Sequence, residues 1–138
     1  MVLDASTILA LFLTEEHSQA TREMYGELET SQPRFGAPDL LVHEVSNGLR
    51  KRVRAGLLTS EHAEQALAGL LQMEVRLHPG ADLARQALAL AIAHEISAYD
   101  AAYLALSLRT AASLVSLDRD FRRPAQALGV TLIDPSAD

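Results

Sequence analysis

Short runs of β-forming residues alternate with longer stretches of helical periodicity along this 138-residue chain, and this alternation restricts its fold more than any other feature. The β-type runs are "MVL" at 1–3, "RFGA" at 34–37, "EVRLH" at 74–78, "SLVSL" at 113–117 and "VTLI" at 130–133. Helical spacing of apolar residues covers 6–28, 39–54, 60–72, 80–94, 98–110 and 120–128. The chain is therefore predicted to be an α/β protein with a mainly parallel sheet and helices on both faces.

Helix start and stop signals support several of these limits. They are Pro38 with Asp39 before the second helical stretch and Gly56 after it, Thr59 or Ser60 with Glu61 before the third, and Gly129 after the last. Since 49% of the residues are hydrophobic, the chain can bury a core of useful size, and one domain over residues 1–138 is expected.

Composition also restricts the chemistry and the setting. The chain has no cysteine, which excludes disulfides and zinc–thiolate sites and makes a reducing cytoplasm the simplest location. The apolar start "MVLDASTILALFL" lacks a basic leader, and its uninterrupted apolar run is too short to span a bilayer. We therefore expect neither a secretion signal nor a membrane anchor.

The distribution of charge is more informative than its sum. The net charge of −6 argues against non-specific coating of the surface by nucleic acid. Seven of the twelve Lys and Arg residues nevertheless fall in two clusters, "RKRVR" at 50–54 and "RDFRR" at 119–123. Because the planar fork of Arg suits phosphate oxygens, these clusters are candidates for contact with a phosphate backbone.

Two carboxylates directly follow predicted strands. Asp4 comes after "MVL" and Asp118 after "SLVSL". In open parallel sheets, ligands bind outside the carboxyl ends of the strands, so both residues lie where a site is expected. Each also has a structural explanation, because an Asp that precedes a helix is a good N-cap. For either residue taken singly, capping is the stronger interpretation.

Glu44 lies at the border of the apolar face of the helix predicted over 39–54. On a helical wheel, the apolar stripe lies on one side of Glu44, and the other side holds Asn47, Arg50, Lys51 and Arg54. A carboxylate at the edge of the core, followed by an amide and then by cations, suits the lining of a cleft. A solvated amphipathic helix with Glu44 on its flank explains the pattern equally well.

Asp100 is the single carboxylate of the nearly apolar stretch "ISAYDAAYLALSL" at 96–108. Ser97, three residues earlier, completes the pattern of a capping box. The residues that follow are apolar on every side, which predicts a buried helix. Asp100 is therefore expected to begin that helix inside the protein, where a helix N-terminus favours negative charge.

If these four carboxylates converge, stability alone does not account for them. Two carboxylates about 4 Å apart repel by roughly 4 kcal/mol at an effective dielectric constant of about 20. Either some of them are protonated, or a cation lies among them. Mg²⁺ takes one or two carboxylates together with water and substrate phosphates. An acidic pocket with Mg²⁺ or Mn²⁺ and nearby arginines indicates phosphoryl-transfer chemistry.

Four segments, in this order and spacing, resemble the PIN-domain ribonucleases and in particular the VapC-type toxins of bacterial toxin–antitoxin pairs. They are "VLDASTILALFL", "HEVSNGLRK", "SAYDAAYLALSL" and "LVSLDRDF". The resemblance covers nearly the whole chain. It implies a three-layer α/β/α sandwich with a mainly parallel central sheet, in which four acids bind one or two divalent metal ions, Mg²⁺ or Mn²⁺.

The resemblance implies a role for each matching residue. Asp4 and Asp100 match direct or nearly direct metal ligands, and Glu44 and Asp118 complete the catalytic acidic cluster. The supporting positions are Ser6, Asn47 and Ser116, the last of which stands where such proteins often have Thr. Ser6 and Asn47 also have simpler explanations, as a helix-capping residue and a solvated helix flank.

The expected activity is metal-dependent endonucleolytic cleavage of RNA. A metal-activated water attacks phosphorus in line, so the 2′-hydroxyl is not needed for attack and a 5′-phosphate product is expected. Cations expected to hold the RNA backbone are Arg50, Lys51, Arg54 and Arg119, with Arg122 or Arg123. For each single cation, a solvated basic surface explains the sequence as well.

The resemblance also implies two protein partners. One is a cognate antitoxin whose C-terminal segment occupies the groove near the acids. The other is a second copy of the chain in a homodimer. The apolar segment "STILALFL" is compatible with a dimer interface, although a core helix has the same composition.

Three alternatives remain. A PIN-like domain that only binds RNA or acts as a scaffold keeps the fold without activity, although the presence of all four acids weighs against it. A phospho-receiver domain needs a Lys at a late strand end, whereas the only lysine, Lys51, lies on a predicted helix. A haloacid-dehalogenase-type phosphatase needs an acid two residues after its nucleophilic Asp, where this chain has Ser6.

Overall fold

A computed structural model describes residues 1–32 and 34–137 and contains one five-stranded sheet. The strands are β1 (Val2–Leu3), β2 (Phe35–Pro38), β3 (Val75–His78), β4 (Leu114–Val115) and β5 (Leu132–Ile133). All neighbouring strands are parallel, in the order β3-β2-β1-β4-β5. The predicted fold class is confirmed, and each strand lies within or next to a run predicted from the sequence.

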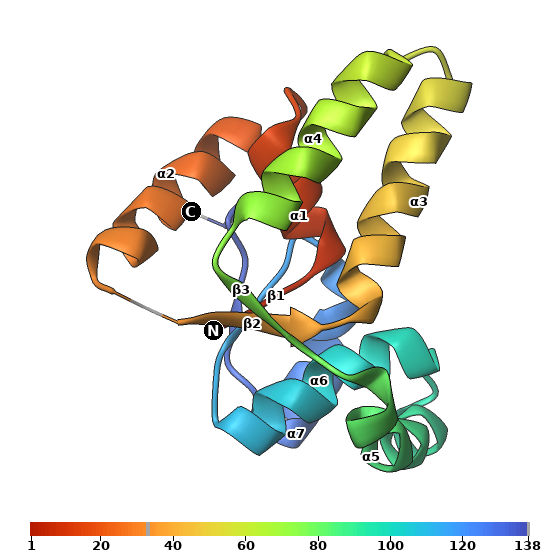
Figure 1. Ribbon diagram of the computed structural model, residues 1–138. Helices are drawn as coiled ribbons and strands as arrows, with labels where there is room; N and C mark the ends of the chain where they lie inside the picture. Colours follow the sequence, from red (N-terminus) through yellow and green to blue (C-terminus); the bar gives the residue numbers. More distant parts are fainter. Residues whose placement is uncertain (33, 138) are drawn as a thin grey trace.

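Helices cover both faces of the sheet (Figure 1). They are α1 (Ala5–Phe12), α2 (Ser18–Thr30), α3 (Leu40–Arg54), α4 (Ser60–Gln72), α5 (Gly80–His94), α6 (Ala98–Thr110) and α7 (Arg122–Leu128), with a 3₁₀ turn at Arg119–Phe121. The first four helices lie on one face, and α5, α6 and α7 lie on the other (Figure 1). The architecture is therefore the predicted three-layer α/β/α sandwich.

The single helix predicted over 6–28 is wrong, because the chain breaks it into α1 and α2. Leu13 is extended and His17 is left-handed, with φ of 68°. The break is stabilised by side chains that bond the free carbonyls: Ser18 Oγ and the Arg22 guanidinium both donate to the Leu13 carbonyl, at 2.8 and 2.6 Å. Residues 14–19 are all polar, so the apolar spacing lapses across this turn, and that gap was the local signal of the break.

Most predicted helix ends are confirmed. Gly56 and Gly129 follow their helices with φ of 74° and 70°, the left-handed conformation that favours glycine. Of the two candidates before α4, Thr59 is the cap, since its side chain accepts from the His62 amide at 3.1 Å. Asp39 precedes α3 but does not cap it, because its carboxylate accepts from the Gly80 amide at 3.0 Å instead.

The strand order determines where a site can form. From β1, two successive crossovers lead to β2 and then to β3 on one side, while β4 and β5 lie on the opposite side of β1. The point between β1 and β4 is therefore the topological switch point, where open α/β sheets bind ligands at the carboxyl ends of their strands. Asp4 directly follows β1, and Asp118 follows β4.

The helix predicted to be buried lies in the core. Every residue of α6 from 101 to 107 is buried, so this helix packs between the sheet and α5 with no solvated side over that span. The segment α1, considered above as a dimer interface, is also part of the core, because Ile8 and Leu9 are buried. Among the described residues, no helix is both long and apolar enough to cross a membrane.

Candidate active site

Asp4 is a buried carboxylate with several hydrogen-bond donors. It is 4% exposed and caps α1 by accepting from the Thr7 amide at 3.0 Å. The hydroxyls of Ser6, Thr7 and Ser116 also donate to it, those of Ser6 and Thr7 at 2.7 and 3.0 Å. Burial raises the pKa of Asp4, and the four donors oppose that rise. The residue is therefore both the predicted helix cap and a carboxylate held rigidly in place.

Two serine hydroxyls connect the segments that follow β1 and β4. Ser116 Oγ donates to Asp4 and accepts from the Asp118 amide at 2.9 Å. Ser6 Oγ donates to Asp4 and accepts from the Leu117 amide at 3.0 Å. These bonds bring the two strand ends together at the switch point. Asp118 then caps the 3₁₀ turn, because its carboxylate accepts from the amide of residue 120 at 2.9 Å.

Glu44 reaches this region from α3. Its Oε1 accepts a hydrogen bond from the Tyr103 hydroxyl at 2.7 Å. Burial raises the pKa of Glu44, the negative charges of Asp4 and Asp118 raise it further, and the hydrogen bond from Tyr103 opposes the rise. Burial and the neighbouring Glu44 carboxylate raise the pKa of Tyr103, so this phenol stays protonated and acts as a donor.

Asp100 is affected by the charges of all three other acids. It lies in the first turn of α6, where its amide donates to Ser97 Oγ at 3.0 Å, which forms half of the predicted capping box. Burial raises the pKa of Asp100 to about 6, with further contributions from Asp118, Glu44, Asp4 and Asp120. The structure therefore brings the four predicted acids into one electrostatic neighbourhood.

A pocket of about 400 Å³ opens beside Asp100. Its other lining residues are Glu95, Ile96, Ser97, Arg119, Asp120 and Arg123. Of the predicted RNA-binding cations, Arg119 therefore lies at the same pocket as Asp100. A larger hollow of about 650 Å³ lies at the opposite edge of the sheet, where β2 and β3 begin, and contains none of the four acids.

The remaining predicted cations are placed differently. Arg122 forms an ion pair with Asp134 at 3.0 Å, so of the two alternatives Arg123 is the one at the pocket. Arg50 and Arg54 line a groove between α3 and α4 rather than the acidic pocket. Lys51 and Asn47 are exposed on α3, on the solvent side of the same helix.

The donor set fits a divalent ion in its chemistry, since carboxylate oxygens are the ligands that Mg²⁺ and Mn²⁺ prefer. Among residues 1–32 and 34–137, no three Asp, Glu or His side chains lie close enough together to hold an ion jointly. An ion would thus take one or two of these carboxylates and complete its shell with water and phosphate, which is the usual arrangement for Mg²⁺.

Two residues of the site were not predicted from the sequence. Thr7 donates to Asp4 through both its amide and its hydroxyl. Tyr103 donates to Glu44 from a ring that is 1% exposed. A signal existed for both: Thr7 is the third residue after a capping Asp, and a tyrosine in a buried apolar helix needs a partner for its hydroxyl.

Comparison with solved structures places this fold among known ones. The VapC20 toxin of Mycobacterium tuberculosis, described as cleaving the sarcin–ricin loop, superimposes with a TM-score of 0.70 at 22% identity, over 94% of this chain and 95% of that one. A toxin–antitoxin complex from Klebsiella pneumoniae gives a TM-score of 0.66 at 19% identity, over 99% and 98%. The shared architecture is an α/β/α sandwich.

Sequence comparison identifies the family. The family model of the PIN domain matches residues 1–127. Ribonuclease VapC3 of Pyrobaculum aerophilum is 34% identical over 130 residues, which cover 93% of this chain and 96% of that protein. The chain belongs to the PIN-domain family, and the predicted resemblance to VapC proteins is confirmed.

Proposed function

We propose that this protein is a metal-dependent endoribonuclease and the toxin of a toxin–antitoxin pair. The observation that carries the proposal is the placement of Asp100, whose pKa is raised to about 6 by burial and by four further acids, beside a pocket that Arg119 and Arg123 also line. Perturbed carboxylates in a cleft are typical of functional sites. The similarity to Ribonuclease VapC3 supports RNA as the substrate.

The residues have distinct tasks in this proposal. Asp4, fixed by its donors, and Asp100, at the pocket, are the carboxylates best placed to hold a Mg²⁺ or Mn²⁺ ion, with Glu44 and Asp118 completing the negative field. Such an ion supplies Lewis acidity and an activated water for in-line attack on phosphorus. Arg119 and Arg123 position the phosphodiester, and water as nucleophile leaves a 5′-phosphate on the product.

Cleavage of structured RNA by the purified protein tests the proposal. We expect cleavage with Mg²⁺ or Mn²⁺, loss of cleavage in EDTA, and loss in an Asp100→Asn variant that keeps the wild-type circular dichroism spectrum. Product ends are mapped by ligation that requires a 5′-phosphate. Cleavage that survives EDTA would contradict metal dependence, and full activity of Asp100→Asn would remove Asp100 from the site. RNA binding without cleavage would favour the inactive scaffold.

An antitoxin partner and a homodimer complete the proposal. The toxin–antitoxin complex among the structural neighbours supports the first. Exposed apolar side chains support the second: Leu88 and Ile92 on α5 are 58% and 73% exposed. Light scattering after size exclusion is expected to give a dimer that Ile92→Arg converts to a monomer, and a monomeric wild type at micromolar concentration would contradict it.

A further inference from the structure

The hydroxyl of Tyr103 holds one oxygen of Glu44, and this contact connects two helices that carry predicted site acids. Tyr103 lies one helical turn after Asp100 on α6, and its hydroxyl donates to Glu44 Oε1 on α3 at 2.7 Å. The ring is 1% exposed. A buried phenol without an acceptor is costly, so this bond holds both partners in place.

The aromatic ring also contacts the segment that carries the fourth acid. Phe121, three residues after Asp118, packs edge-to-face on Tyr103, with ring centroids 6.3 Å apart at 77°. Phe121 is itself 2% exposed. Tyr103, which lies on α6, therefore contacts both α3 and the 3₁₀ turn. This one side chain connects the three segments that carry Glu44, Asp100 and Asp118 and holds them in place relative to one another.

The position of the Glu44 carboxylate depends on this contact. Asp4 has four donors, whereas among the described residues Asp118 has one, a backbone amide, and Glu44 has one, a side-chain hydroxyl. Within residues 1–32 and 34–137, Tyr103 is the only hydrogen-bond partner of the Glu44 carboxylate. The flexible Glu44 side chain is otherwise free to leave the site, and with Oε1 occupied, Oε2 remains for an ion or its water.

We infer that Tyr103 is a positioning residue, which orients the Glu44 carboxylate relative to the neighbouring acids and thereby sets how well the carboxylates that take the ion hold it. The inference rests on the proposed function. Tyr103 itself touches neither ion nor substrate and acts through Glu44. Groups that orient metal-binding carboxylates in this way typically contribute about 10–100-fold to metal affinity or activity.

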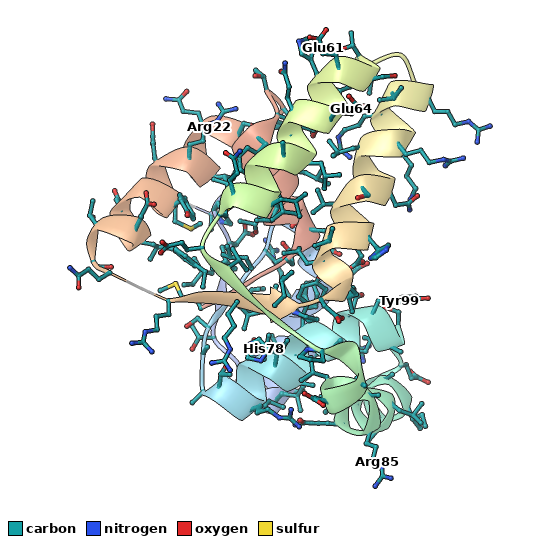
Figure 2. The ribbon with its side chains drawn as sticks, viewed as in Figure 1. Arg22, Glu61, Glu64, His78, Arg85 and Tyr99 are labelled. Atoms are coloured by element: carbon teal, nitrogen blue, oxygen red, sulfur yellow. The ribbon has the colours of Figure 1, made fainter. Side chains whose placement is uncertain are left out.

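Tyr103→Phe removes only the hydroxyl, and Tyr99→Phe is its matched control. Tyr99 lies on the same helix, is 66% exposed and projects outward (Figure 2). Mn²⁺ affinity is measured by electron paramagnetic resonance, and kcat and KM are measured on RNA. We expect Tyr103→Phe to weaken Mn²⁺ binding and kcat by about 10–100-fold with KM unchanged, and Tyr99→Phe to match wild type. A lower melting temperature with unchanged Mn²⁺ affinity would overturn the inference.

Two further variants test the connection through Glu44. In a Glu44→Ala background, Tyr103→Phe is expected to change Mn²⁺ affinity little, because the acceptor is gone; a full additional loss contradicts the inference. Glu44→Asp keeps the charge and leaves Tyr103 in the core, but its shorter side chain no longer reaches the Tyr103 hydroxyl. It is therefore expected to weaken Mn²⁺ binding as much as Tyr103→Phe does. Unchanged binding in Glu44→Asp also contradicts it.

The outcomes separate this inference from the function on which it rests. A wild-type protein that neither cleaves RNA nor binds Mn²⁺ contradicts the proposed function and, with it, the role of Tyr103. A wild-type protein that does both, together with a Tyr103→Phe variant that does both equally well, contradicts the positioning role alone.

Discussion

At the scale of single residues, Asp100 shows how burial and charge act on one carboxylate. Its pKa is raised from 3.8 to about 6, first by burial and then by the other acids. An unfolded chain ionises this group near its ordinary pKa, whereas the folded protein resists ionisation until about pH 6. In the absence of metal, the contribution of Asp100 to stability is therefore complete below about pH 4 and is lost as the pH rises through 6.

We accordingly expect Asp100→Asn to raise the melting temperature of the metal-free protein at pH 8 and to leave it nearly unchanged close to pH 4. The side chain of Asn carries no charge, whereas the charge of Asp100 destabilises the folded protein at pH 8, where the carboxyl group is ionised, and not near pH 4. Scanning fluorimetry in EDTA measures the effect. Glu64→Gln, on the exposed side of α4 (Figure 2), is the control and is expected to show no such pH dependence. An equal shift of Asp100→Asn at both pH values would contradict the electrostatic explanation.

At the scale of secondary-structure elements, close packing of α1 on α3 requires a small residue. A Cβ added at Gly48, in the middle of α3, would lie 2.7 Å from Leu9 Cδ1, and Leu9 is 8% exposed. Gly26, in the middle of α2, has no atom within 4 Å of the corresponding position. The two glycines are thus in similar helical settings but in opposite packing environments.

Alanine substitution at these glycines is expected to have opposite effects on the free energy of unfolding. Gly26→Ala gains the helix propensity of alanine, about 0.5–1 kcal/mol. Gly48→Ala has the same gain but overpacks a buried contact, which typically costs about 1–3 kcal/mol, so a net loss is expected. Urea denaturation measures both. A stabilised Gly48→Ala protein would show that Leu9 has room to move.

At the scale of the whole molecule, the proposed function requires an acidic protein to bind an anion. The net charge is −6, yet Arg119 and Arg123 lie together beside Asp100 at the pocket. Arg122, between them in sequence, is paired with Asp134. Binding of RNA near these arginines is expected to depend steeply on salt, because each phosphate contact releases counterions.

The salt dependence of RNA binding is expected to distinguish Arg119 and Arg123 from Arg122. Replacing Arg119 or Arg123 by alanine is expected to reduce the slope of log K against log salt by about 0.7 for single-stranded RNA. Arg122→Ala is expected to leave the slope unchanged. Fluorescence anisotropy on the Asp100→Asn background avoids cleavage during the measurement. Arg85, which projects from α5 away from the sheet (Figure 2), provides the control. An unchanged slope for Arg119→Ala would place the RNA elsewhere.

Much of the fold and part of the candidate site were predictable from local sequence. Strand and helix positions, the caps at Asp4 and Ser97, and the buried character of α6 follow from spacing and capping chemistry within a few residues. The same patterns identified Asp4 and Asp118 as residues at strand ends. The break between α1 and α2 was missed because polar side chains terminate the helix there and no glycine or proline marks the turn, although residues 14–19 are all polar.

Tertiary structure alone decided which of these local features meet. The strand order places β1 beside β4, and only then does Ser116 bond Asp4 across 112 residues. Likewise Tyr103 meets Glu44 across 59 residues. Periodicity describes which face of an element is buried, but it does not describe which buried faces touch, because that depends on how all elements pack at once. The sequence by itself thus determined the elements and the residues able to carry charge, and packing determined which of those residues lie near one another.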